Sequence, residues 1–363
     1  MTAHESTTGS RGTFGGILAS SLRHGSALWL LALFVIVFSF TAPATFPTLL
    51  TVQIVLSDHV TTALLALAIL VPLCGGNFDF SVGALMALGM ALTGVLTNYG
   101  VDVLPAAIIA IALTAFCGFV SGFIMVKLNV NSFIATLGVS QVATALTLLV
   151  TQNKQIVVDA PYWFIVLTQG KLLGVSFDVY YLLGIAVVLW YLLEHTAIGR
   201  SLFAAGGNPE AARLAGVRVN RLAWGSMVIS GAIAGLAGVL MLSKVSVYTQ
   251  EYGPSFLFAA FAAVFFGATQ IKGRPNLWGT LIALYVLAVA VAGLQLTFFG
   301  NEYWITPLFN GVALLIAVSL AARKHAGRLY KKLRRGQSPT PEDSEKIDDT
   351  GPAIPATLER NGE

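Results

Sequence analysis

Long apolar runs separated by short polar segments constrain this chain more than any other feature. Only 10% of its 363 residues are charged and 56% are hydrophobic, whereas soluble domains carry about 25% charged residues. A helix needs roughly 20 apolar residues to cross the hydrocarbon core of a bilayer. The runs are too long and too uniformly apolar for the alternating strands of an outer-membrane barrel. The sequence therefore predicts an all-α, polytopic membrane protein.

The apolar runs predict about ten membrane-spanning helices, with a mixed segment over 48–59 before the second. The predicted spans are 26–41, 60–74, 80–99, 103–126, 133–151, 179–193, 222–242, 256–270, 277–298 and 304–322. They form one transmembrane domain over 26–322. A polar lead over 1–25 precedes this domain, and a basic tail over 323–363, expected to end in disorder, follows it.

The distribution of basic residues predicts the orientation of the chain. If the N-terminus is inside, only Lys154, Lys171 and Lys244 of the 21 Lys and Arg residues fall outside. Cytoplasmic loops of membrane proteins carry the excess of Lys and Arg. Both termini are therefore expected in the cytoplasm. Because the basic residues cluster beside the spans, the net charge of +4 does not indicate a nucleic-acid partner.

Small residues recur at helical spacing in two of the predicted spans. In lipid no hydrophobic force holds helices together, so small side chains that allow close backbone approach favour packing. We interpret this set as helix-packing positions: Gly118, Gly122, Gly231, Gly235 and Gly238.

Known catalytic motifs are absent from the sequence. It contains no Gly-x-x-x-x-Gly-Lys-Ser/Thr phosphate loop, no His-Glu-x-x-His, no Cys-x-x-Cys and no Gly-x-Ser-x-Gly. Cys74 and Cys117 lie in apolar runs and are expected to be buried thiols. The spans also lack the chains of ionisable residues that mark proton-coupled pumps. These absences favour a transporter whose energy is supplied elsewhere over an enzyme or a metal site.

Four ionisable residues lie near membrane depth: Asp58, His59, Asp79 and Glu194. Most of them stand near predicted span ends, where a solvated interfacial position is expected. Asp79 belongs to an interruption, Gly75-Gly76-Asn77-Phe78-Asp79-Phe80-Ser81-Val82-Gly83. Non-helical backbone at this depth must be satisfied by protein or by a watery cavity. The interruption could be a tight turn that caps the next helix through Asp79 or Ser81, a broken helix that lines a pathway, or both.

Polar residues also open the fifth span, where Asn129 and Ser132 are among them. They could hydrogen-bond a hydroxylated solute in transit, or they could cap the helix and bond neighbouring helices. Together with the interruption they give a predicted translocation set: Asp79, Ser81, Asn131, Phe133, Thr136 and Gln141.

A charged loop over 195–221 contains its own helix signals. Asn208 suits the N-cap and Pro209 the first helical position. Glu210 places negative charge at the positive end of the helix dipole, and Gly216 suits a left-handed C-terminal exit. The loop therefore predicts a helix of roughly two turns, which is too short to be stable alone in water.

Three stretches resemble signature segments of monosaccharide ABC-transporter permeases, the ribose/xylose/galactose group within the wider family that includes branched-chain amino-acid permeases. They are GGNFDFSVGALMAL, NSFIATLGVSQVATALTLLVTQ and TAIGRSLFAAGGNPEAARLAGVRVNRLAWGSMVISGAIAGLAGVL. The resemblance covers roughly 26–322 with the same order and spacing. The chain departs from the usual Gly-Gly-x-Asp-Leu-Ser-Val-Gly stretch by one extra residue and by Phe80 in place of Leu.

The resemblance implies a type II-like ABC importer permease in the bacterial inner membrane. Its loop between the sixth and seventh spans would carry a coupling helix that docks on a separate ATPase subunit, which binds ATP–Mg; this chain would bind no cofactor. Further implied partners are an extracytoplasmic solute-binding protein and a second permease copy or paralogue in the surrounding lipid. The implied coupling residues are Gly207, Asn208, Pro209, Glu210, Ala211, Ala212, Arg213 and Gly216.

Other interpretations stay open. The same machinery could carry a branched-chain amino acid, a nucleoside or a quorum-signal sugar derivative instead of a monosaccharide or polyol. From a different class, the chain could be a stand-alone secondary transporter or channel.

Overall fold

The computed structural model describes residues 26–270, 274–299 and 304–334. The chain divides into two units at Ala317/Val318, and the arrangement below is that of the first unit. The predicted lead over 1–25 and the end of the predicted tail, 335–363, lie outside the described residues.

The described chain consists of helices, four two-residue strands and the loops that connect them. Its helices are α2 (Ser26–Thr41), α3 (Leu49–Asp58), α4 (Val60–Cys74), α5 (Val82–Asn98), α6 (Val103–Lys127), α7 (Ser132–Thr151), α8 (Tyr162–Gln169), α9 (Phe177–Trp190), α10 (Ala197–Gly207), α11 (Pro209–Leu214), α12 (Val219–Val245), α13 (Pro254–Gln270), α14 (Leu277–Leu294) and α15 (Ile305–Arg334). Two π-helical turns, η1 (Tyr191–His195) and η2 (Gln295–Phe299), extend α9 and α14. The strands are β1 (Ile156–Val157), β2 (Lys171–Leu172), β3 (Val175–Ser176) and β4 (Val247–Tyr248), paired antiparallel as β1–β4 and β2–β3.

Every predicted span coincides with an apolar helix of the structure. Five helices are long and apolar enough to cross a membrane, namely 103–127, 132–151, 177–195, 219–245 and 277–297. The pair α3 and α4 meets the same test together and bends by 42° at His59. Four shorter apolar helices cover 27–41, 82–98, 254–268 and 305–319. A polytopic helical membrane protein follows from these lengths, because only helices and closed barrels satisfy their backbone within lipid.

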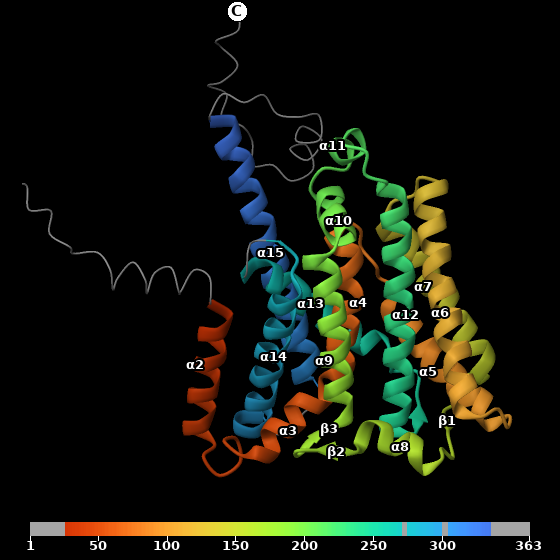
Figure 1. Ribbon diagram of the computed structural model, residues 1–363. Coiled ribbons are helices and arrows are strands. Elements are labelled where there is room, and N and C mark those ends of the chain that lie inside the picture. Colours follow the sequence, from red (N-terminus) through yellow and green to blue (C-terminus); the bar gives the residue numbers. More distant parts are fainter. Residues whose placement is uncertain (1–25, 271–273, 300–303, 335–363) are drawn as a thin grey trace, which may run out of the picture. The chain divides into compact units, whose positions relative to one another are not determined.

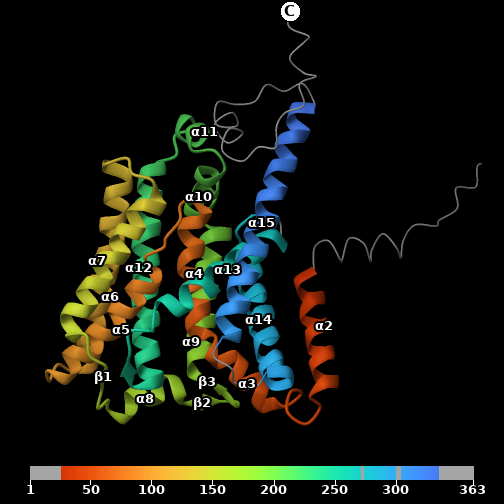
Figure 2. The same ribbon diagram turned by 180° about the vertical axis from the view of Figure 1, so that it is seen from behind.

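Helix α4 lies at the centre of the first unit (Figures 1 and 2). It contacts α5, α9, α12, α13 and α14, and 14 of its 15 residues are buried. A helix that is apolar on all sides is buried on all sides, which explains the uniformly apolar sequence Val60–Cys74.

The glycines of α12 allow close approach to α5 and α6. A Cβ atom on Gly231 or Gly235 would overlap Thr114 of α6, and one on Gly238 would overlap the carbonyl oxygen of Met86 in α5. The other two predicted packing positions, Gly118 and Gly122 of α6, lie against the backbone and side chain of α12. The predicted packing role of the small residues is therefore confirmed.

The two ends of the helical bundle differ. One end carries α10 and α11 and the start of α12, and we refer to it as the loop end. The other carries the β2–β3 hairpin and α8, and we refer to it as the hairpin end (Figure 1). Residues 152–178, which connect two of the predicted spans, contain α8 and three of the strands. Helix α12 spans 27 residues and connects the two ends over roughly 40 Å at 1.5 Å per residue.

Substitution of Gly231 by Ala is expected to destabilise the protein, because the added methyl group would meet the Thr114 carbonyl. Overpacking typically costs about 1–3 kcal/mol. The matched control is Gly225→Ala in the same helix, since no atom lies within 4 Å of its added Cβ and Ala favours a helix over Gly by about 1 kcal/mol. Thermal unfolding in detergent should show a lower Tm for Gly231→Ala only. Equal Tm values for the two variants would contradict the packing account.

Candidate functional site

Helix α11 is the short helix that the charged loop predicts. The Asn208 side chain accepts a hydrogen bond from the Ala211 N–H at 2.9 Å, and Pro209 is the first helical residue. Gly216 has a φ of +83°, the left-handed exit for which glycine is suited. The predicted start and stop signals are confirmed, and the helix is six residues long.

Helix α11 presents most of its surface to solvent. Ala212 is buried against the bundle, whereas Glu210, Ala211 and Arg213 are exposed. Leu214, at the last helical position, is 92% exposed. Helix α11 thus combines one exposed apolar side chain with exposed charged and small residues. Sequence reasoning placed the helix but left Leu214 out of the implied coupling set.

Helix α10 precedes α11 and was not predicted. The Thr196 hydroxyl caps it by accepting from the Gly199 N–H at 3.2 Å. Arg274, which precedes α14, lies 4.3 Å above the Phe203 ring and forms an ion pair with Glu194 at 2.9 Å. Glu194, expected at a solvated interface, is therefore engaged in a contact that ties α9 and α10 to the start of α14.

The turn of the interruption packs directly against α10. Gly76 has a φ of +80°, and a Cβ atom on it would lie 3.3 Å from the Gly206 Cα. A Cβ atom on Gly206 would overlap the Cys74 carbonyl oxygen. The charged loop and the Gly75–Gly76 interruption, which sequence analysis identified separately, are thus in contact.

Asp79 forms a tight turn at the interruption. Its Oδ1 accepts hydrogen bonds from the Ser81 N–H at 2.9 Å and from the Ser81 hydroxyl at 2.6 Å. Both side chains are fully buried. Asp79 Oδ2 and Ser230 Oγ of α12 are buried and have no hydrogen-bond partner within the described part of the chain. The tight turn is observed, but Ser81, the N-cap of α5, makes no side-chain capping hydrogen bond. A role of Asp79 and Ser81 in translocation stays a prediction.

The start of α7 holds this interruption in place. Ser132 and Thr136 accept hydrogen bonds from the backbone N–H groups of Phe78 and Phe80, each at 3.1 Å. Phe133 meets the Phe80 ring edge-on, with centroids 4.9 Å apart. The structure thus brings together four members of the predicted translocation set: Asp79, Ser81, Phe133 and Thr136.

The other two members of that set lie apart from the interruption. Asn131 caps α7 by accepting from the Phe133 N–H at 2.8 Å. Gln141 is exposed on α7, five residues beyond Thr136. Neither hydrogen-bonds the interruption within the described residues, and a translocation role for them stays a prediction.

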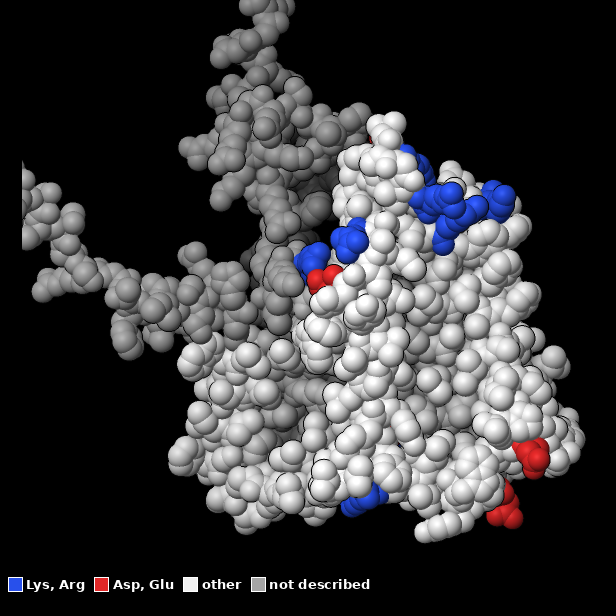
Figure 3. Space-filling view, in the orientation of Figure 1, with Lys and Arg blue, Asp and Glu red and all other residues white. Residues whose placement is uncertain are grey.

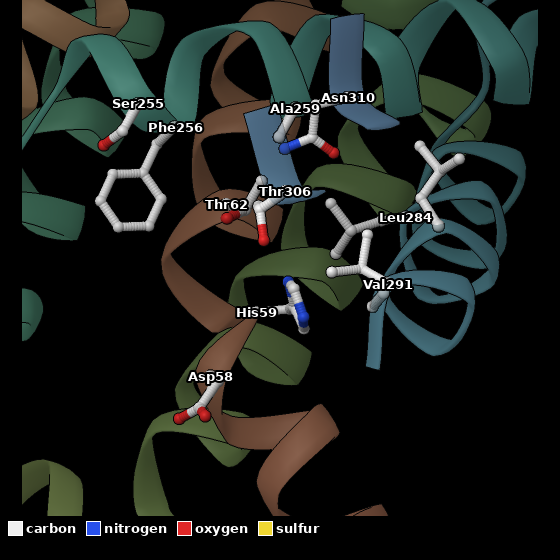
Figure 4. Close-up of a pocket in the computed structure, with 12 residues that line it drawn as sticks. Asp58, His59, Thr62, Ser255, Phe256, Ala259, Leu284, Val291, Thr306 and Asn310 are labelled. Atoms are coloured by element: carbon white, nitrogen blue, oxygen red, sulfur yellow. The ribbon is translucent and has the colours of Figure 1, made fainter. Parts of the chain in front are cut away.

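A cavity of about 260 Å³ lies among α4, α13, α14 and α15 (Figure 4). Sequence reasoning singled out only Asp58 and His59 among its lining residues, because the others come from helices far apart in the chain. Its polar lining consists of Asp58, His59, Thr62, Ser255, Thr306 and Asn310.

An ion network lies beside this cavity at the hairpin end. Lys244, near the end of α12, forms ion pairs with Asp58 at 3.1 Å and with Asp178 at 3.5 Å. Its Nζ also donates to the Ser57 carbonyl oxygen at 2.8 Å, and the Ser57 hydroxyl donates to Asp178 at 2.9 Å. Asp178 is buried, so the network fixes α12 to α3 and α9.

Fold and site together define a polytopic helical membrane protein with an exposed, capped helix at its loop end. Residues 51–318 match the family described as branched-chain amino acid transport system / permease component. The chain belongs to this family of transport permeases.

Curated relatives in this family are import permeases. The chain is 30% identical to the ribose import permease protein RbsC of Escherichia coli K12 over 277 residues, which cover 74% of this chain and 85% of that protein. It is 32% identical to RbsC of Bacillus subtilis over 69% of this chain and 78% of that protein. It is 30% identical to the fructose import permease protein FrcC of Rhizobium meliloti over 67% and 70%, respectively. No solved structure matches the chain.

Replacement of Asn208 by Ala is expected to loosen α11 without unfolding the bundle, because it removes the cap of the Ala211 N–H. Loss of an N-cap costs about 0.5–2 kcal/mol. Hydrogen exchange of a peptide covering 205–216 should accelerate in Asn208→Ala and stay near wild type in Asn208→Asp, which retains an acceptor. Unchanged exchange in Asn208→Ala would show that the cap does not hold the helix.

Proposed function

We propose that this chain is the membrane-spanning permease subunit of a bacterial ABC importer for a monosaccharide or related polyol. The observation that carries the proposal is α11, an exposed and well-capped helix with Leu214 at its tip, in a chain of the permease family. A six-residue helix is not stable alone, and contact with a partner protein would stabilise it. An ATPase subunit at this end would supply both the partner and the energy.

The charge distribution supports a cytoplasmic loop end. Lys and Arg side chains gather at the end that carries α11 (Figure 3), where Arg200, Arg213, Arg218 and Arg221 lie on α10, α11 and the start of α12. We place the protein in the bacterial inner membrane. By the positive-inside rule, its loop end then faces the cytoplasm. Both termini would then be cytoplasmic, and α11 would lie where ATP is available.

The proposed assembly contains further subunits. A second permease copy or paralogue would complete the pathway, and two ATPase subunits would bind ATP–Mg. An extracytoplasmic solute-binding protein would dock on the hairpin end. Closure of the ATPase pair on ATP would move α11. Because α10 packs on the Gly75–Gly76 interruption, that motion would reach the membrane-embedded helices and drive alternating access.

The cargo assignment rests on the import permeases for ribose and fructose among the relatives. The family description favours a second cargo, a branched-chain amino acid. A nucleoside or a quorum-signal sugar derivative would fit the same machinery.

A stand-alone secondary transporter is the second candidate function. The observation that favours it is Asp79, a carboxyl group that is fully buried in the interruption. Ionisable groups within a membrane protein commonly mark ion pathways. Such a transporter would be inhibited by an uncoupler and would be insensitive to ATP depletion.

Sugar uptake into membrane vesicles tests both candidates. With the complete assembly, uptake should require ATP and should vanish when the ATPase subunit is omitted. Glu210→Lys or Ala211→Trp should leave the protein folded, because both side chains are exposed on α11. Each should uncouple ATP hydrolysis from transport by disturbing the docking of α11 on the ATPase subunit. Ala211→Ser, which adds little bulk, is the matched control.

Two outcomes would contradict the proposal. Undiminished uptake without the ATPase subunit would exclude an ATP-driven importer. Normal coupled transport in both Glu210→Lys and Ala211→Trp would exclude α11 as the docking helix.

A further inference from the structure

The cavity among α4, α13, α14 and α15 has the composition of a binding site for a small hydroxylated molecule. We propose that it is a transit site for a neutral monosaccharide-sized polyol, an inference that rests on the proposed importer function. Small-molecule sites are mostly apolar, with a few well-placed polar groups, and their volumes begin at about 300 Å³. At about 260 Å³, this cavity suits one small ring.

The polar groups of the cavity can hydrogen-bond hydroxyl groups. Figure 4 shows His59, Thr62, Thr306 and Asn310 around one space. Hydroxyl and amide side chains both donate and accept, and neutral imidazole has one donor and one acceptor. The side chains of His59, Thr62 and Asn310 form no hydrogen bond with any other described residue. The hydrogen-bond donors and acceptors of these three side chains are therefore available to a solute. A sugar hydroxyl can bond to them because it also donates and accepts.

The apolar part of the cavity matches the other surface of a sugar ring. Leu284 and Val291 of α14 lie on one side, and Phe256 of α13 lies on the other (Figure 4). Such side chains can cover the carbon-bound hydrogens of a ring while the polar groups bond its hydroxyls.

The charges at the cavity favour a neutral solute over an amino acid. No Lys or Arg is present among the described lining residues. The acidic residue there, Asp58, forms its ion pair with Lys244 at 3.1 Å. The carboxylate of a zwitterionic amino acid would find no cationic partner in the lining, and burying an unpaired charge is costly.

The cavity also lies where a transit site is needed. Its α13 residues, Ser255 and Ala259, belong to the part of the helix near the hairpin end. Further along α13 toward the loop end, Phe261 stacks on Phe80 with centroids 4.3 Å apart. Phe261 lies two residues beyond Ala259, about 200° around the helix, so this contact is on the face of α13 opposite the cavity. Because the cavity lies near the hairpin end, a solute delivered there would reach it before the loop end.

Filling the cavity tests the proposal. Ala259→Phe adds a ring to its wall, and Ala112→Phe is the matched control because Ala112 is exposed on α6, between Ile108 and Phe116, which are also exposed. The complete assembly, with its ATPase and binding protein, is placed in proteoliposomes, and ATP-driven uptake of D-ribose and D-fructose is measured beside ATP hydrolysis. Ala259→Phe should lower sugar uptake at least about tenfold while ATP hydrolysis persists. The added phenyl ring would occupy the volume that a sugar ring needs, and a packed cavity accommodates extra atoms poorly. Ala112→Phe should transport like wild type.

Two smaller substitutions keep the test decisive if Ala259→Phe fails to fold. Thr62→Val and Asn310→Leu remove hydrogen-bonding groups at nearly constant volume, and each should lower sugar uptake about fivefold, the effect of one neutral hydrogen bond. Wild-type uptake in a folded Ala259→Phe protein, or in both polar variants, would overturn the transit site. Preference of the wild type for leucine over both sugars would overturn the neutral-polyol assignment. Wild-type uptake that persists when the ATPase subunit is omitted would instead refute the proposed function.

Discussion

The rest of the structure depends on the close packing of α12 against α5 and α6. An apolar helix surface gains little hydrophobic free energy when it exchanges contacts with lipid for contacts with protein. Contacts between membrane helices therefore rely on dispersion forces and close approach. The glycines at 231, 235 and 238 bring the α12 backbone against Thr114 and Met86. This contact fixes a helix that begins beside α11 and ends at the ion network of Lys244.

The two proposed functional regions are connected through this helix and through α10. At the loop end, α10 is held by the Arg274 contacts and by its approach to Gly76. At the hairpin end, Lys244 of α12 pairs with Asp58, the residue before His59 in the cavity wall. A movement that begins at α11 therefore has two physical routes into the bundle, one through the interruption and one along α12.

Sequence reasoning predicted those features whose causes are local. Apolar runs predicted the helices, and Asn208, Pro209 and Gly216 predicted the bounds of α11, because caps act within a few residues. It missed α10 although the Thr196 cap is local, and the contacts of this helix with Arg274 and Gly76 come from distant parts of the chain. It also missed the cavity, since four helices contribute to its wall. The turn at Asp79 was one of two open alternatives, because a sequence does not show which buried groups satisfy an interrupted backbone.

The central claim is that α11 faces an ATPase subunit while the hairpin end faces a solute-binding protein. Leu214 in α11 and Leu173 in the β2–β3 hairpin are each 92% exposed, and the native Cys74 and Cys117 are both buried. A thiol-linked photo-crosslinker on Leu214→Cys or Leu173→Cys in the complete assembly tests the claim most directly. The account predicts an adduct with the ATPase subunit from position 214 and with the solute-binding protein from position 173. An ATPase adduct from position 173, or its absence from position 214, would contradict it.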